Sequence, residues 1–219
     1  MKTLRTMLRG APGDLGIAAL EIASIEHPGL DPQPTLTQLD QWGTRCHSLM
    51  SVLHLLYGQL CFSGNQRDYY NPLNSCLNSV VTRRTGIPIT LSLVVWQVAR
   101  RAGVALDPIG LPGHFVLGVR GESLYVDAFN GGQLLSQEEC VQLAAEGAGT
   151  DISQDPSIFK PIPPAAVLFR MLNNLRAIYR SRNAYDKALQ VLDLMTYATR
   201  SADLERERAQ MQEMVSSRR

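Results

Sequence analysis

Two residues of the kind that activates a nucleophile stand on neighbouring strand-like segments of the sequence. His114 begins the apolar run in GLPGHFVLGV, just after a proline–glycine turn, and Asp127 ends the run in LYVDAFNGG. In a nucleophilic triad a carboxylate orients an imidazole, and the imidazole takes a proton from a hydroxyl or thiol. The pattern indicates two members of such a triad and leaves the third to be found.

The elements that must position these residues are a helix and a set of strands. Pro88 suits the first turn of a helix that runs to residue 101 and is closed by Gly103. After it, the hydrophobic period changes from helical to extended, and a tight turn at residues 121–122 joins the last two strands. The expected strands cover residues 106–111, 114–120 and 123–129.

Helices are expected over most of the remaining chain, at residues 15–26, 35–60, 75–84, 136–145 and from 165 onward. Their expected N-caps include Asp14, Ser136 and either Asn74 or Ser75. Helices followed by a small antiparallel sheet and a helical tail define the α+β class. We expect one domain over residues 1–146, a linker over 147–164 and a helical tail over 165–219.

The tail has a periodicity of its own. Leu175, Tyr179, Ala188 and Leu192 fall four, nine and four residues apart, which are the offsets at which a tetratricopeptide hairpin packs its two helices. A single hairpin cannot bury its apolar face alone, so it must pack on the domain or on a partner. An ordinary helical hairpin is the alternative interpretation.

Composition excludes several classes of function. The chain has 219 residues, 45% of them hydrophobic, and a formal net charge of +1, so no basic field favours nucleic acid or an anionic membrane. The start of the sequence lacks the apolar core of a signal peptide, and we expect a soluble, cytoplasmic protein. The four cysteines and four histidines show no zinc-ligand spacing, so neither a metal nor a cofactor is expected.

The segments DYYNPLNSCLNSVVTRRTGIPITLSLVVWQVARRAGV, GLPGHFVLGV and LYVDAFNGG together resemble the transglutaminase-like superfamily, in the SirB-type branch with a tetratricopeptide-like tail. The resemblance implies a papain/transglutaminase-like core with a cysteine at the N-terminus of its central helix. His114 and Asp127 match the histidine and aspartate positions. The helix that matches the central one begins Gly-Ile-Pro-Ile-Thr, however, without a cysteine, and its only hydroxyl belongs to Thr90.

Cys76 is the one nearby thiol. It lies at the expected start of the helix before the central one, where a helix N-terminus lowers a thiol pKa, and the turn at Gly86 offers a way to fold it back toward the site. The alternative interpretation is a small buried side chain that only packs.

Two hypotheses about the function follow from these observations. The leading one is a non-catalytic protein-interaction or regulatory module, with His114 and Asp127 as vestiges and a protein or peptide as partner. The alternative is a cysteine-dependent acyl transferase or amide or thioester hydrolase that uses Cys76, His114 and Asp127. A structural subunit of a larger assembly is a third possibility. The expected binding residues are Asn71, Asn74, Arg83, Arg84, Thr90, Gly113 and Asn130.

Overall fold

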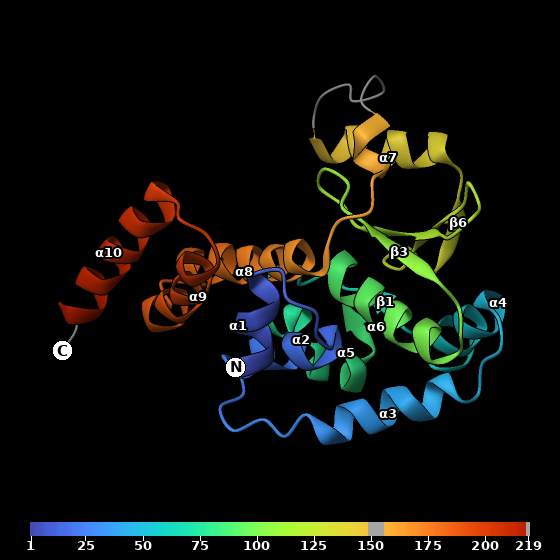
Figure 1. The fold of residues 1–219 in the computed structure, drawn as a ribbon, viewed down its shortest axis with the longest axis horizontal. Coiled ribbons are helices and arrows are strands. Elements are labelled where there is room, and N and C mark those ends of the chain that lie inside the picture. The colour runs from blue at the N-terminus through green and yellow to red at the C-terminus, as the bar shows by residue number, and fades with distance from the viewer. Residues whose placement is uncertain (149–155, 218–219) are drawn as a thin grey trace.

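The computed structural model describes residues 1–148 and 156–217 (Figure 1). Its helices and helical turns are α1 (Lys2–Leu8), α2 (Leu15–Ala23), α3 (Gln33–Gly43), α4 (Leu49–Leu53), the π-helix η1 (His54–Gln59), the 3-10 helix η2 (Pro72–Ser75), α5 (Leu77–Arg83), α6 (Pro88–Arg101), α7 (Gln137–Ala148), the 3-10 helix η3 (Pro156–Phe159), α8 (Pro164–Ser181), α9 (Tyr185–Ala198) and α10 (Ala202–Ser216). Its strands are β1 (Ser63–Gly64), β2 (Thr85–Gly86), β3 (Leu106–Ile109), β4 (Val116–Val119), β5 (Tyr125–Asp127) and β6 (Gln133–Leu135). The class is α+β, as expected.

Helix α6 is the centre of the fold. It packs against α3, α4, α5, α8 and the strand β4, and almost every residue from Pro88 to Ala99 is buried. A helix that is apolar on all sides belongs in a core, where each buried Val or Leu contributes roughly 1.5–3 kcal/mol. The expected helix over residues 88–101 is confirmed. Within the described ranges, no helix has the length and apolar character needed to cross a bilayer.

The four-stranded sheet is antiparallel in the order β3-β4-β5-β6. The three expected strands are confirmed with shorter bounds, and residues 120–124 join β4 to β5 in place of the predicted two-residue turn. Strand β6 was not expected, because its residues are exposed or half-buried and show no apolar alternation. Strands β1 and β2 form a separate parallel pair, with Gly64 opposite Gly86.

The predicted single helix over residues 35–60 is wrong. Helix α3 ends at Gly43, where a Cβ atom would lie 2.3 Å from the Cβ of Arg101 on α6, so only glycine lets the two helices approach this closely. A new helix begins at α4, where Ser48 and Ser51 form a reciprocal capping box. The chain then continues as the π-helix η1 up to Gln59.

The expected cap of α5 is also wrong. Cys76 itself occupies the N-cap position, where its side chain makes no capping hydrogen bond, while Asn74 and Ser75 belong to η2, which Asn71 caps. Helix α5 ends before Arg84, which adopts the left-handed conformation (φ 58°), rather than at Gly86. Residues Lys2–Leu8, ahead of Asp14, form α1, which was not expected and which buries Leu4, Met7 and Leu8.

The tail packs on the rest of the molecule. Buried residues of α8 and α9 join those of α1, α2 and α6 in one hydrophobic cluster, and the four residues of the predicted hairpin contact are all buried. Both a tetratricopeptide hairpin and an ordinary hairpin accommodate this packing. The predicted linker lies partly outside the described residues, and the domain boundaries stay predictions.

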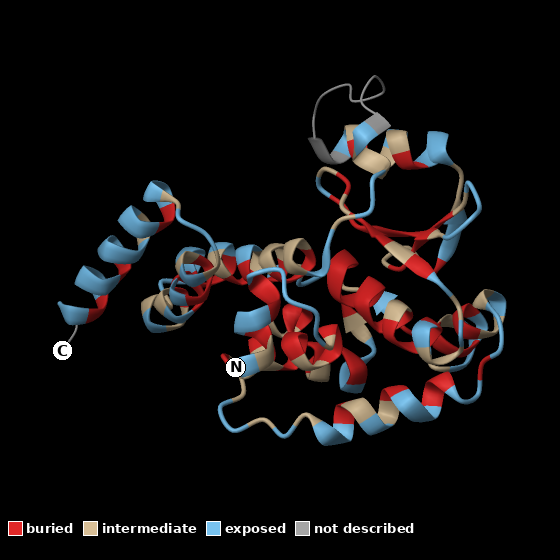
Figure 2. Ribbon diagram, viewed as in Figure 1, coloured by how far each residue is buried: buried red, intermediate tan, exposed pale blue. Residues whose placement is uncertain are grey.

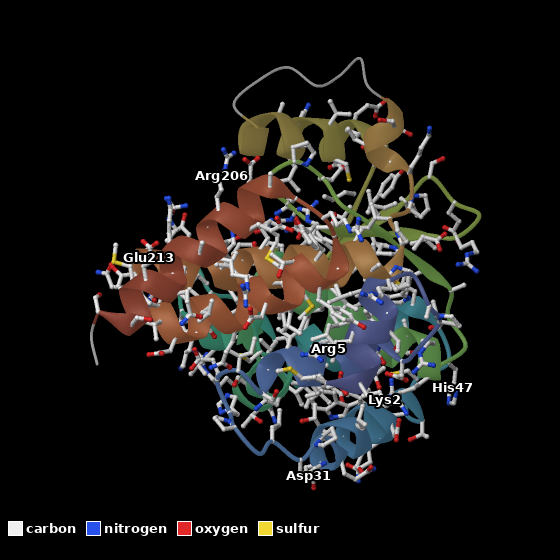
Figure 3. The ribbon with its side chains drawn as sticks, turned by 60° about the vertical axis from the view of Figure 1, so that its left-hand side comes forward. Lys2, Arg5, Asp31, His47, Arg206 and Glu213 are labelled. Carbon is white, nitrogen blue, oxygen red and sulfur yellow. The ribbon has the colours of Figure 1, made fainter. Side chains whose placement is uncertain are left out.

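Helix α10 is the outermost element and lies on α9 (Figure 1). Figure 2 shows it exposed except along one side, where Leu204, Met211 and Val215 are buried. Arg206 and Glu213 project from its outer surface into solvent (Figure 3). The thin apolar side that the sequence shows in this helix therefore packs within the chain.

Candidate functional site

His114 and Asp127 form a buried pair at one end of the sheet. His114 lies two residues before the start of β4 and Asp127 is the last residue of β5, so the antiparallel β4–β5 pairing brings the two together. His114 Nε2 lies 3.0 Å from Asp127 Oδ1, and the residues are 9% and 1% exposed. The predicted pairing of imidazole and carboxylate is present in the structure.

Asp127 is held by the turn that follows it. Its Oδ1 accepts hydrogen bonds from the backbone N–H groups of Phe129 (3.0 Å) and Asn130 (3.2 Å), and its Oδ2 accepts one from Asn130 Nδ2 (2.8 Å). Burial alone would raise the pKa of Asp127, but the hydrogen bonds and charge of His114 and the bonds from Asn130 outweigh burial and lower it. The carboxylate is therefore kept ionised and fixed in orientation.

The segment that carries His114 is held by an arginine from the tail. Arg170 of α8 donates from Nη2 to the carbonyl oxygens of Leu111 (3.0 Å) and His114 (2.8 Å). A Cβ on Gly110 would lie 2.6 Å from Arg170 Nη1, so glycine at this position leaves room for the guanidinium. Gly113 has a left-handed φ of 67°, a conformation that favours glycine. Sequence reasoning missed Arg170, although a lone arginine in the apolar stretch AAVLFRML was a signal of a buried partner.

One aromatic ring lies against the imidazole. The rings of Phe129 and His114 are nearly perpendicular, with centroids 6.2 Å apart, and Tyr69 lies 6.0 Å from Phe129. Tyr57, on the π-helix η1, donates its hydroxyl to the carbonyl oxygen of Ala128 (2.8 Å), and burial together with the Asp127 charge raises its pKa. These contacts hold the turn after β5 and cover one side of the histidine.

The N-terminus of α6 lies beside this pair. Ser92 donates to the carbonyl oxygen of Phe115 (3.4 Å), which sets the position of α6 against the residue after His114. Pro88 lies one turn before Ser92 on the same side of the helix. Thr90 is fully buried, and its hydroxyl has no hydrogen-bond partner within the described ranges. The first turn of α6 presents no thiol.

A profile of the transglutaminase-like superfamily matches residues 29–173. The chain belongs to this superfamily. It is 36% identical over 194 residues to a UPF0162 protein of Xylella fastidiosa strain 9a5c, with 80% of this chain and 68% of that protein covered. It is 38% identical over 154 residues to F-box only protein 21 of Mus musculus, with 66% of this chain and 23% of that protein covered. No solved structure matches.

In this transglutaminase-like chain, Cys76 lies in an environment that opposes its use as a nucleophile. It is fully buried, and its thiol donates to the carbonyl oxygen of Pro72 (3.4 Å). Burial, assisted by the negative charge of Glu26, raises its pKa to about 12. The expectation that a helix N-terminus would lower this pKa is wrong, because desolvation outweighs the short helix α5. No hydrogen bond joins Cys76 to His114 in the part of the chain that the structure describes.

The predicted binding residues fall into separate groups. Asn130 and Gly113 belong to the His114–Asp127 site. Asn74 is fully buried and accepts from Asn65 and Arg83, while its amide donates to the carbonyl oxygens of Asp68 and Tyr69. Its bonding capacity is therefore filled within the chain.

The other members of the set also have internal roles. Asn71 caps η2 and donates to the carboxylate of Asp68 (2.8 Å). Arg84 lies apart, at the end of α5, where it donates to the carbonyl oxygen of Leu60 (3.2 Å). Thr90 is enclosed in the core. Of the seven predicted residues, only Asn130 and Gly113 take part in positioning His114 and Asp127.

Proposed function

We propose that this transglutaminase-like chain is a non-catalytic protein-interaction module whose His114–Asp127 pair has a structural role. The observation that carries the proposal is the absence of a reactive thiol from the first turn of α6, together with the raised pKa of Cys76. The thiolate is the nucleophilic form of cysteine, and a pKa of about 12 leaves almost none of it at neutral pH.

The bonding of the pair supports a structural role. Asp127 accepts hydrogen bonds from His114, Phe129 and Asn130, so it ties β5, the turn after it and the start of β4 together. A buried carboxylate with this many partners stabilises a loop arrangement whether or not chemistry takes place there.

The relatives support a modular role. The match to this chain covers 68% of a bacterial UPF0162 protein but only 23% of a mammalian F-box only protein. A unit that recurs in chains of such different length is used as a building block. A helical tail packed on the unit adds the kind of surface that binds peptides and partner helices.

The cysteine-dependent alternative rests on the 3.0 Å His114–Asp127 contact, which is the geometry that orients an imidazole toward a nucleophile. In this alternative, Cys76 attacks an amide or thioester carbonyl. The alternative requires Cys76 to leave its buried position beside Pro72 and approach His114.

The test is intact-mass spectrometry of the full chain after incubation with p-nitrophenyl acetate and butyrate, alongside Cys76→Ala and His114→Ala. The proposal expects no acyl adduct on Cys76 and no difference among the three proteins in the rate of nitrophenol release. An adduct on Cys76 that disappears in His114→Ala would establish the enzyme. Any partner that binds wild type should bind Cys76→Ala equally well.

A further inference from the structure

A cavity lies away from the His114–Asp127 site, where the α8–α9 turn meets the core. Its accessible volume is about 430 Å³, and its walls include Glu26 after α2, Pro72 of η2, Tyr179 of α8, Arg182 of the α8–α9 turn and Lys187 of α9. Ligand-sized pockets start at about 300 Å³. The cavity therefore has room for a few peptide residues and is formed jointly by the core and the tail.

Two polar groups of this cavity, Glu26 and Tyr179, are largely buried, while the Arg182 side chain is 48% exposed. Lys187 Nζ lies 2.7 Å from Glu26 Oε2, and the Glu26 side chain is only 12% exposed. Tyr179 is 1% exposed, and burial together with the Glu26 carboxylate beside its hydroxyl raises the pKa of Tyr179. The Glu26 carboxylate is therefore shared between the Lys187 ammonium and the Tyr179 hydroxyl.

Two cationic side chains of the cavity have hydrogen-bond donors that they do not use within the described residues. The guanidinium of Arg182 donates no hydrogen bond to any described residue, and its nearest carboxylate, Asp68, is 3.9 Å away and 57% exposed. Lys187 uses one of its three N–H groups on Glu26. The groups left over are the fork of Arg182 and two N–H groups of Lys187, and both can donate to a bound acceptor.

We propose that this cavity binds the C-terminal carboxylate of a partner peptide, with Arg182 as its principal contact. The planar fork of an arginine matches a carboxylate in a bidentate geometry. The lining also contains the carboxylates of Glu26 and Asp186, so its formal charges balance. Repulsion from these two carboxylates weighs more on a dianionic phosphate than on a monoanionic carboxylate. The inference rests on the proposed interaction function and names the chemistry of its partner.

The test is NMR titration of the ¹⁵N-labelled full chain with acetyl-Gly-Ala-Ala and, as the matched ligand, the same peptide with a C-terminal amide. The acid should cause saturable shifts in the amides of residues 182–187, and the amide should bind at least about tenfold more weakly, because one bidentate charged contact is worth that much. Arg182→Gln should lose the same factor. Arg180→Gln, two residues before Arg182 and 64% exposed but outside the cavity lining, should bind like wild type.

Three results would overturn the inference: no saturable shift at residues 182–187, equal binding of acid and amide, or tighter binding of inorganic phosphate than of the peptide acid. The spectra of the two variants show directly whether each remains folded. None of these results bears on acylation of Cys76, so failure of this inference and failure of the proposed function are observed in separate experiments.

Discussion

Replacing Arg170 with methionine removes the contact that joins the tail to the His114 segment. The variant keeps most of the side-chain length but loses the two N–H donors that reach the carbonyl oxygens of Leu111 and His114. It also loses the guanidinium that lies 5.6 Å from the centre of the Phe115 ring. We expect a clear loss of stability and a displaced His114.

The size of the loss follows from these contacts. A hydrogen bond from a charged donor contributes about 1.5–3 kcal/mol, and a partly buried cation–π contact about 0.5–1 kcal/mol. Part of this gain is offset because the charge of Arg170 no longer has to be desolvated, and burial lowers its pKa in wild type for the same reason. The net expectation for Arg170→Met is a decrease of about 2–4 kcal/mol in the free energy of unfolding.

Urea unfolding at pH 7 measures this change, and the imidazole resonances of His114 report the displacement. Arg180→Met is the matched control, because Arg180 lies on the same helix but is 64% exposed, with Glu207 3.8 Å away. Its stability should change by less than about 0.5 kcal/mol. A loss below about 1 kcal/mol in Arg170→Met, with His114 resonances unchanged, would refute the assigned role of Arg170.

Three further predictions concern the core and the site. Asp127→Asn should destabilise the protein by about 1–3 kcal/mol at pH 7. The pKa of Asp127 is lowered in the fold, so the difference in stability between wild type and Asp127→Asn should hold above about pH 4. It should vanish as the pH falls through the lowered pKa, and urea titrations at pH 7 and pH 3 measure the change. Cys76→Ala should cost about 1 kcal/mol of stability by leaving a small cavity, without affecting partner binding in titration calorimetry. Gly43→Ala should lower the thermal midpoint by about 5 °C or more, since its Cβ would meet Arg101; an unchanged midpoint would contradict this packing.

Sequence patterns predicted what depends on local periodicity. The helix over residues 88–101 and the strands beside His114 and Asp127 have apolar patterns that only burial explains, and the structure contains them. The pairing of His114 with Asp127 followed, because two adjacent antiparallel strands bring the start of one close to the end of the next.

What depends on tertiary contacts was not predictable in this way. The break after Gly43 exists because α3 crosses α6 at Arg101, a contact between residues far apart in the sequence. The burial of Cys76 beside Glu26 depends on how α2, α5 and α9 pack, and no local pattern specifies this. Arg170 was missed for the same reason, since its two acceptors lie in a different part of the chain.

The most direct test of the central claim is the rate at which iodoacetamide alkylates Cys76 between pH 5 and 9, in wild type and His114→Ala, followed by peptide mass spectrometry. Exposed Cys61 provides an internal reference in the same protein. We predict that Cys61 is labelled at a rate that rises with pH while Cys76 is labelled only after unfolding, with the same result in both proteins. Labelling of Cys76 faster than Cys61 below pH 7, slowed by loss of His114, would reveal a thiolate–imidazolium pair and contradict the non-catalytic account.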